Sequence, residues 1–570
     1  MIGALTRKAR QVLEDPVLRR WMMRRALRLE PAPPPFTAGH PPYLPSVDIG
    51  AETPQWNGPA PAVPLAMPTK PLRVALAGES FEIAPDDPGA LFERRHVDIE
   101  VELAAHRFAW LPVSGSAIDP CWVAALWAAW LERHAKARTG WAWHAYTAAE
   151  RAINILDYAQ RHGLPGAEAQ TLTVLAGHAE AIASSLEYFG DHYTSNHLSN
   201  NGRGLLRIGT ALGMDGTARL GARIMTAEAG RIFGQSGVLR EGSTHYHLLV
   251  TRNYIDAWLD AKSAGLEQAG MLRDVAERAV AAIPGLCLPG GLPLIGDISP
   301  DVSPAYLGRL CGGAADSDAW PAHLPDDRQK AAHALIEGAA GAPISPDKLA
   351  EDGWHRFGDH QWHALVYVPP DGWPPMPGHG HHDLSGFELH DGDVPVIVDP
   401  GRGSYCDPEY AGAELHSGVT IDGARPTPLN RPYYTAAFRA RIVGARPDMS
   451  RTQDGRILRH AGFSRLPRVG AAEREWRLLD DRVEILDRID GRGRHRISWR
   501  FFTAADVQTT PDGIALTVAD ATYRLSSAIS ATVSNAVRWR EYGHGDPGRL
   551  VQFDHVVKLP YEFKTIIKRF

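Results

Sequence analysis

The sequence predicts an α+β protein in which a helical region precedes an antiparallel β region. Between about residues 118 and 345, apolar residues recur at three- and four-residue steps, the spacing of amphipathic helices. After about residue 350, short runs of β-branched and aromatic residues appear, and Asp-Gly pairs separate many of them. The two patterns do not mix, so we expect the helices and the sheets in successive parts of the chain.

The composition limits the possible functions. The chain has 570 residues, 44% of them hydrophobic, which is enough for two or three domains with separate cores. Its net charge of −6 does not fit a protein that binds duplex nucleic acid. The four cysteines lie far apart and form no CxxC pair, so we expect reduced thiols. No run of 18 apolar residues and no secretory signal is recognisable, which predicts a cytoplasmic protein without a membrane span.

Residues 1–75 are predicted to be a basic amphipathic segment followed by a proline-rich connector. Within residues 1–30, eight arginines and lysines interleave with leucines, methionines and a tryptophan. Such a helix could lie on an anionic membrane surface, peripheral to the inner membrane, or pack on the body of the protein. We favour packing on the protein, because most amphipathic helices pack internally.

Residues 76–348 are predicted to form the helical domain. Apolar residues recur at helical spacing near its start, at Trp122, Leu126, Trp127 and Trp130. Alanine- and leucine-rich segments follow at 171–188, 204–233, 243–265 and 271–283, with glycine-rich joints. Helices in series with short joints indicate a toroid or a solenoid of paired helices. The sequence has no fixed repeat, which makes a regular solenoid the weaker alternative.

Residues 349–570 are predicted to form an antiparallel β domain. Alternating or β-branched runs include 363–368, 482–486, 496–501 and 551–557. Many short strands with turn signals between them favour a sandwich over a barrel.

The most unusual segment runs from Met376 to Tyr405. It places His379, His381, His382 and Asp383 within five residues and continues to Asp399. Imidazole and carboxylate groups suit zinc and similar divalent metals. On a strand, His379, His381 and Asp383 would share one face. His416, 17 residues after Asp399, could complete a metal site with His381 and Asp399.

Two polar clusters lie in the helical domain. The first contains Asn196, His197, Asn200 and Asn201, of which Asn200 and Asn201 are candidates for helix capping. The histidine is not needed for capping, which makes the Asn196-His197 pair a functional candidate.

The second cluster surrounds Tyr246. This tyrosine lies in the first turn of a predicted helix between His245 and His247. The aromatic residues that follow it, Tyr254 and Trp258, are interpreted as core. For Tyr246 to act as a base, its pKa must fall, and we expect His197, His245 or His247 to lower it.

Together these segments resemble the heparinase II/III-like polysaccharide lyases, whose relatives include oligoalginate lyases. The resemblance extends from about residue 118 to the end. It rests on Asn196-His197, Glu241-Gly242 with Tyr246, His379-Gly-His381-His-Asp383, Asp399-Pro-Gly401, and His416 with Thr420-Ile-Asp-Gly423. It implies an incomplete (α/α) toroid followed by an antiparallel β-sandwich, with an active cleft between them.

The resemblance also implies an activity and its residues. The substrate would be an anionic, uronic-acid-containing polysaccharide or oligosaccharide, cleaved by β-elimination. Asn196 and His197 would bind the substrate carboxylate, and Tyr246 and His379 would transfer the protons. One structural divalent metal, usually zinc, would be bound by His381, Asp399 and His416.

Several other functions are compatible with these residues. A metallo-hydrolase of the His-x-His-x-Asp-His type is disfavoured, because position 384 is leucine. An iron oxygenase could use His381, Asp383 and a distal histidine, but it has no use for the long helical domain. A uronyl C5-epimerase would share the proton abstraction without elimination. A non-catalytic carbohydrate-binding protein of polysaccharide biosynthesis would bind the polymer without turnover.

Overall fold

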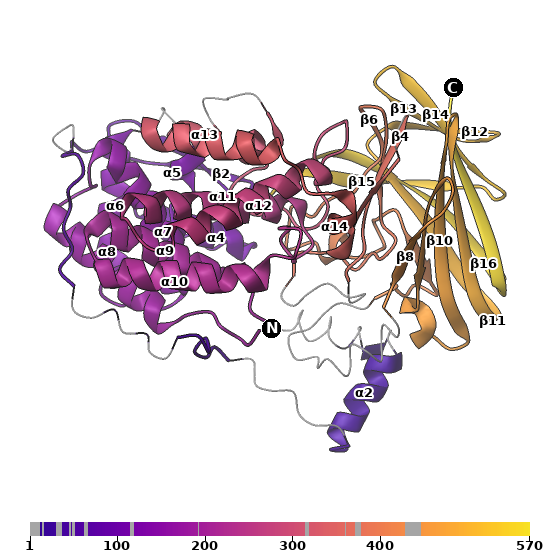
Figure 1. Cartoon of the computed structure of the whole chain (residues 1–570), viewed down its shortest axis with the longest axis horizontal. Coiled ribbons are helices and arrows are strands. Elements are labelled where there is room, and N and C mark those ends of the chain that lie inside the picture. The colour runs from indigo at the N-terminus through magenta and orange to yellow at the C-terminus, as the bar shows by residue number, and fades with distance from the viewer. Residues whose placement is uncertain are drawn as a thin grey trace.

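The computed structural model describes residues 9, 12–13, 16–29, 37–44, 47, 49, 52–61, 66–113, 119–191, 193–313, 319–358, 361–370, 378–427 and 446–570. The long helices lie on the left of Figure 1 and the two larger sheets on the right, whereas β2 of a small hairpin lies among the helices. The predicted α+β class, helices first and sheets second, is confirmed. The predicted division between residues 348 and 349 falls within the last helix.

In chain order the described helices are α2 (Pro16–Ala26), α3 (Ala90–Glu93), α4 (Ile99–Arg107), α5 (Trp110–Val113), α6 (Pro120–His134), α7 (Ala145–His162), α8 (Glu168–Ser184), α9 (Asn196–Leu212), α10 (Asp215–Ile232), α11 (Thr244–Ser263), α12 (Ala269–Leu286), α13 (Asp326–Ala340) and α14 (Pro346–Glu351). The 3-10 helices are η2 (Trp141–Trp143), η3 (Ala305–Cys311), η4 (Trp320–His323), η5 (Pro408–Ala411) and η6 (Gly462–Arg465).

The long helices pack as pairs around a common axis. Helices α7, α9 and α11 contact one another in succession, and each is backed by the helix that follows it, α8, α10 or α12. This arrangement of inner and outer helices is that of an incomplete (α/α) toroid, one of the two alternatives that the helical pattern left open.

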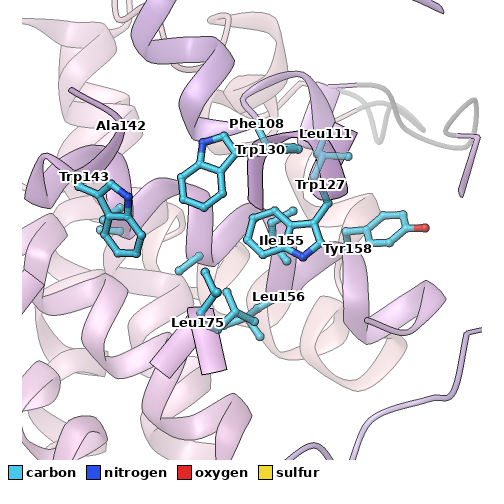
Figure 2. Packing of buried hydrophobic residues seen from close by; sticks show 14 of the residues in the cluster. Phe108, Leu111, Trp127, Trp130, Ala142, Trp143, Ile155, Leu156, Tyr158 and Leu175 are labelled. Atoms are coloured by element: carbon cyan, nitrogen blue, oxygen red, sulfur yellow. The ribbon is translucent and has the colours of Figure 1, made fainter. Parts of the chain in front are cut away.

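Aromatic side chains fill the core of the first part of the toroid. Trp127 and Trp130 of α6 stack with ring centroids 5.4 Å apart, and Trp143 lies 5.8 Å from Trp130. Figure 2 shows these three rings among the buried residues of the cluster. The guanidinium of the buried Arg151 lies 3.9 Å from the Trp130 ring centroid. Burial of large aromatic area is a strong contribution to the stability of such a core.

A short hairpin precedes the toroid and was not predicted. Strands β1 (Leu72–Leu76) and β2 (Glu79–Ile83) pair antiparallel through a two-residue turn. Both turn residues, Ala77 and Gly78, have positive φ, of 44° and 85°. A Cβ on Gly78 would lie 2.4 Å from the Cα of Gly543, so the turn requires glycine where it touches the β domain.

The described part of the β domain forms two antiparallel sheets. The smaller sheet has the order β3 (Trp354–Phe357), β4 (Trp362–Tyr367), β5 (Glu388–Asp391), β6 (Val394–Ile397). The ten-stranded sheet has the path β12 (Asp506–Thr510), β13 (Gly513–Val518), β14 (Ala521–Ser527), β16 (His544–Arg569), β11 (Arg482–Thr503), β10 (Val469–Leu479), β9 (Gly455–His460), β8 (Asp448–Arg451), with β15 (Thr532–Glu541) on β16 and β7 (Val419–Ile421) on β11.

The two sheets share one core. Trp362 and Leu389 of the smaller sheet belong to the same buried cluster as Trp476, Trp499 and Phe501 of the larger sheet. The sheets therefore pack face to face, and the predicted sandwich is confirmed.

The N-terminal segment is described in part. Residues 1–8 of the predicted amphipathic segment lie outside the described residues, and α2 covers its second half. Leu18 and Trp21 are buried, whereas Arg19 and Arg20 are exposed, which fits a helix packed on protein. Among the described helices, none combines the length and the apolarity needed to cross a membrane.

Candidate active site

The start of α11 directs Tyr246 towards the β domain. The Ser243 hydroxyl caps this helix by accepting a hydrogen bond from the Tyr246 N–H at 3.1 Å, and it donates to the carbonyl oxygen of Asp297 at 2.7 Å. Gly242 has a φ of 75°, and a Cβ there would lie 2.6 Å from the Tyr367 ring. Only glycine fits this turn, so the Glu241-Gly242 pair is required for the placement of Tyr246.

Tyr246 and His379 meet across the two domains. Their rings stack with centroids 3.5 Å apart and planes inclined by 6°. The Tyr246 and Tyr405 hydroxyl oxygens are 2.7 Å apart, so one hydroxyl donates to the other. The two residues predicted to transfer protons thus lie in contact, with a second phenol beside them.

His379 lies between two carboxylates. Its Nδ1 is 3.3 Å from Asp297 Oδ2, and its Nε2 is 3.2 Å from Glu241 Oε2. A neutral imidazole has one N–H, so the ring donates to both carboxylates only as the imidazolium. The backbone N–H of His379 also donates to the Glu241 carbonyl oxygen at 2.9 Å. These contacts hold the ring flat on Tyr246.

Glu241 also holds Asn196. The Asn196 N–H donates to Glu241 Oε1 at 2.7 Å, and the Asn196 side-chain amide donates to Glu241 Oε2 at 2.9 Å. Asn196 begins α9, and the capping side chain is Ser195, whose hydroxyl accepts from the His197 N–H. One buried carboxylate therefore joins the first turn of α9 to the catalytic histidine candidate.

His197 presents a charge to the same region. Its side chain is 42% exposed, and its Nδ1 is 2.9 Å from Glu187 Oε1. Burial would lower the pKa of His197, but the charge and hydrogen bond of Glu187 outweigh it and raise this pKa. The Asn201 amide donates to the other Glu187 oxygen at 3.1 Å. Asn200 and Asn201 are buried inside α9, so their prediction as capping residues was wrong; Asn201 positions Glu187 instead.

The electrostatic environment keeps Tyr246 protonated. Burial raises its pKa well above the usual range; the hydrogen bond with Tyr405 lowers it by less, and the charges of Asp301 and Asp297 raise it further. Burial lowers the pKa of His245 to about 3 and that of His247 to about 4, so both are neutral. The prediction that these two histidines lower the pKa of Tyr246 was wrong, because a neutral ring supplies no charge.

Three residues around His379 and Tyr246 were not predicted: Asp297, Arg402 and Tyr405. Asp297 is buried and lies within 3.3 Å of His379, His381 and Arg402. Burial would raise its pKa, but Arg402 and the two histidines lower it. The Arg402 guanidinium lies 4.9 Å from the Tyr405 ring centroid. Arg402 and Tyr405 belong to the histidine-rich segment 376–405, so its unusual composition could have indicated them. Asp297 follows a proline- and glycine-rich loop in which no sequence pattern indicates a functional residue.

The three predicted metal ligands come together. One donor atom from each of His381, Asp399 and His416 lies within 4.8 Å of the others, and all three residues are buried. His416 Nε2 is 2.8 Å from the Tyr410 carbonyl oxygen, which leaves Nδ1 facing Asp399 Oδ2 at 3.2 Å and Asp383 Oδ2 at 2.9 Å.

The chemistry of these donors fits a cation. His381 Nδ1 is buried and has no hydrogen-bond partner among the described residues. A buried imidazole nitrogen without a partner, next to two carboxylates and a second imidazole, is the arrangement that a divalent ion would satisfy. The cluster could hold a metal ion.

The histidine segment is a loop, although we predicted a strand. Between His379 and Asp383 it makes one isolated bridge, from His382 to Gly412, and β5 begins later. The side chains still converge, because His379 and His381 both face Asp297 while Asp383 faces His416. Tertiary contacts replace the alternation of a strand here.

A hollow lies beside Tyr405, between the hairpin β1–β2, the loop 299–303 and the residues Glu541–His544 of the sandwich. The Tyr542 hydroxyl donates to Asp98 at 2.6 Å and accepts from the Tyr405 N–H at 3.1 Å. Asp301, on the floor, accepts from the Tyr146 hydroxyl at 2.7 Å. The candidate site thus borders a hollow formed by both domains.

The comparison with known proteins agrees with this geometry. Residues 343–555 match the family described as heparinase II/III-like, C-terminal. The chain shares its fold with the crystal structure of heparinase III, at 15% identity and a TM-score of 0.62, over 84% of this chain and 79% of that one. The heparan sulfate lyase HepC from Pedobacter heparinus gives 16% identity and a TM-score of 0.51, over 83% and 77%. No curated protein sequence matches significantly.

These findings place the molecule in the class of toroid-and-sandwich proteins. Most of its β domain matches the heparinase II/III-like C-terminal model, and the predicted resemblance to the heparinase II/III-like family is confirmed.

Proposed function

We propose that the chain is a polysaccharide lyase that cleaves a uronic-acid-containing polysaccharide or oligosaccharide by β-elimination. The observation that carries the proposal is the stack of Tyr246 on His379, with the Tyr405 hydroxyl 2.7 Å from that of Tyr246, where toroid and sandwich meet. The similar structures are named as a heparinase and a heparan sulfate lyase, which supports the substrate class.

Elimination needs the substrate carboxylate to be neutralised. The C5 proton of a uronate is weakly acidic, because the adjacent carboxylate resists further negative charge. His197, whose pKa is raised by Glu187, supplies a positive charge. The Asn196 amide has two N–H groups and uses one for Glu241, so the other can donate to the enolate.

The two proton transfers are divided between His379 and Tyr246. The neutral form of His379, with Nδ1–H directed at Asp297 and Nε2 released from Glu241, takes the C5 proton. The C4–O bond breaks, Tyr246 gives its proton to the leaving oxygen, and a C4=C5 double bond forms. The raised pKa of Tyr246 suits the acid role. Asp297 and Glu241 then stabilise the imidazolium. The substrate has to displace Glu241 from its 3.2 Å contact with His379 Nε2. Glu241 Oε2 then keeps its hydrogen bond from the Asn196 amide. The proton returns from His379 to the Tyr246 phenolate through solvent.

We propose that His381, Asp399 and His416 hold one zinc ion with a structural role. When bound, the metal supplies a positive charge and a link between three loops of the sandwich. His379 lies two residues before His381 and shares Asp297 with it, so fixing His381 also fixes the catalytic ring.

Incubation with a panel of uronic-acid polysaccharides, including glycosaminoglycans, alginate and bacterial exopolysaccharides, tests the proposal. We expect near-ultraviolet absorbance from the unsaturated product with at least one polymer. Tyr246→Phe is the matched control and should lower turnover by ~10² or more while the protein stays folded. Deuterium incorporation at C5 without absorbance would indicate the epimerase instead. Binding of a polymer with neither signal would contradict both enzymes.

A further inference from the structure

A charged pocket in the interior of the toroid lies apart from the candidate active site. Its walls come from α7, α9, α11, η3, η4 and the loop before α13. Five arginines and three aspartates line it: Arg161, Arg203, Arg207, Arg252, Arg328, Asp157, Asp256 and Asp260. An unpaired buried charge is energetically costly, so most of these charged side chains are expected to have partners within the pocket.

The carboxylates of the pocket are already satisfied. Asp256 accepts from the Trp320 indole N–H at 3.2 Å and from Arg203 at 3.4 Å. Asp260 accepts from Arg207 at 3.1 Å and from Arg328 at 2.6 Å. Both buried aspartates are thus already paired with arginines, so they do not form a cation site.

Arg252 and Tyr306 are among the donors of the pocket that have no such partners. Arg252 and Tyr306 are each 6% exposed. Among the described residues, the Arg252 guanidinium makes no hydrogen bond, and its only ion pair is a 3.9 Å contact with Asp256. The Tyr306 hydroxyl likewise has no hydrogen-bond partner in the described part of the chain. Arg252 lies on α11 and Tyr306 on η3, two elements that are in contact, and both residues line the pocket.

We propose that this pocket binds an oxyanion, a carboxylate or sulfate group, between the Arg252 guanidinium and the Tyr306 hydroxyl. A guanidinium presents parallel N–H donors that match the two oxygens of a carboxylate or sulfate. The phenol adds a third donor, and the buried pairs around them hold both side chains in place. The ligand is a small anion or an acidic sugar.

The pocket is separate from the catalytic residues. Tyr246 lies in the first turn of α11 and Arg252 six residues later, about 9 Å further along the helix axis. Neither Tyr246 nor His379 lines the pocket. The inference therefore does not depend on the proposed lyase activity.

Calorimetric titration of the full chain with sodium sulfate and with sodium glucuronate, at constant ionic strength, tests the inference. We expect one saturable site per chain for at least one anion. Arg252→Gln should weaken binding by ~10-fold or more, because it removes charge-assisted hydrogen bonds. Tyr306→Phe removes one hydroxyl and should weaken binding by a smaller factor. Arg273→Gln, on the exposed Arg273–Glu277 pair of α12, is the matched control and should bind as the wild type does.

The two anions distinguish the sources of the oxyanion. Binding of both indicates a general oxyanion site, and binding of glucuronate alone indicates an acidic sugar. Absence of saturable binding for both would overturn the inference, as would wild-type affinity in a folded Arg252→Gln variant. If that variant does not fold, Tyr306→Phe decides by the same criterion. Neither result bears on absorbance in the lyase assay, so the two proposals fail independently.

Discussion

Glu241→Gln should loosen the contact between the toroid and the loop that carries His379. Glu241 is 1% exposed, and its Oε2 accepts from the Asn196 amide and forms a 3.2 Å ion-pair contact with His379 Nε2. Glutamine has the same shape but replaces one oxygen by an NH2 group. If that group takes the place of Oε2, it faces the Asn196 amide and His379 Nε2, and one hydrogen bond and one ion-pair contact are lost.

The magnitude follows from these contacts. A hydrogen bond to a charged group contributes about 1.5–3 kcal/mol, and with a similar value for the buried ion pair the loss of both contacts would cost about 3–6 kcal/mol. Rotation of the Asn196 amide would let its oxygen accept from the new NH2 group and recover one bond. We therefore expect the free energy of unfolding to fall by about 2–3 kcal/mol. Turnover should fall as well, because His379 loses a carboxylate that stabilises its protonated form.

Denaturant unfolding and steady-state turnover measure the two effects. A double-mutant cycle with Asn196→Ala should show a coupling of about 1–2 kcal/mol, since the side chains share a hydrogen bond. Glu228→Gln is a matched control: Glu228 is also 1% exposed and binds Tyr43 and Arg231, so its loss should cost stability and leave turnover unchanged. An unfolding free energy within about 0.5 kcal/mol of the wild type, with normal turnover, would refute the reasoning.

Three further predictions follow from the site. Glu187 raises the pKa of His197, so the charged ring persists to higher pH; Glu187→Gln should move the alkaline limb of the kcat/KM profile to lower pH, and an unchanged profile would contradict this role. His416→Ala should abolish the roughly one metal per chain expected by elemental analysis and lower thermal stability; full metal content would argue against the site. Tyr405→Phe should reduce turnover by ~10-fold with little loss of stability, whereas equal turnover would exclude a role for its hydroxyl.

The order of the domains was predictable because it depends on local periodicity. The spacing of Trp127 and Trp130 and the alternation of the late strands are properties of short segments. The hairpin β1–β2 was missed for the same reason. Its turn, Ala77-Gly78, is not one of the strong Asn-Gly or Asp-Gly signals, and it is fixed by the close approach of Gly543 from the sandwich.

The site was predictable only where residues of unusual type cluster along the chain. His379 and His381 attract attention by their density, and Tyr246 by its flanking histidines. Asp297 and Glu187 do not, because a lone acidic residue in a loop is common. Asp297 acts through its contact with His379, 82 residues away in the sequence, and Glu187 through its contact with His197, 10 residues away. The state of His245 also required the structure, since only its burial shows that it carries no charge.

The stack of Tyr246 on His379 has a consequence for how such a protein can be altered by recombination. Each domain carries half of the constellation, so exchanging the sandwich for that of a distant relative would separate two rings that now lie 3.5 Å apart. A functional chimera would have to take the residues of the domain interface from one parent, including Glu241, Gly242 and the loop from His379 to Asp383. The unit that recombination must keep intact is therefore the interface between the two domains. A crossover between the helical and the β domain would take its two sides from different parents.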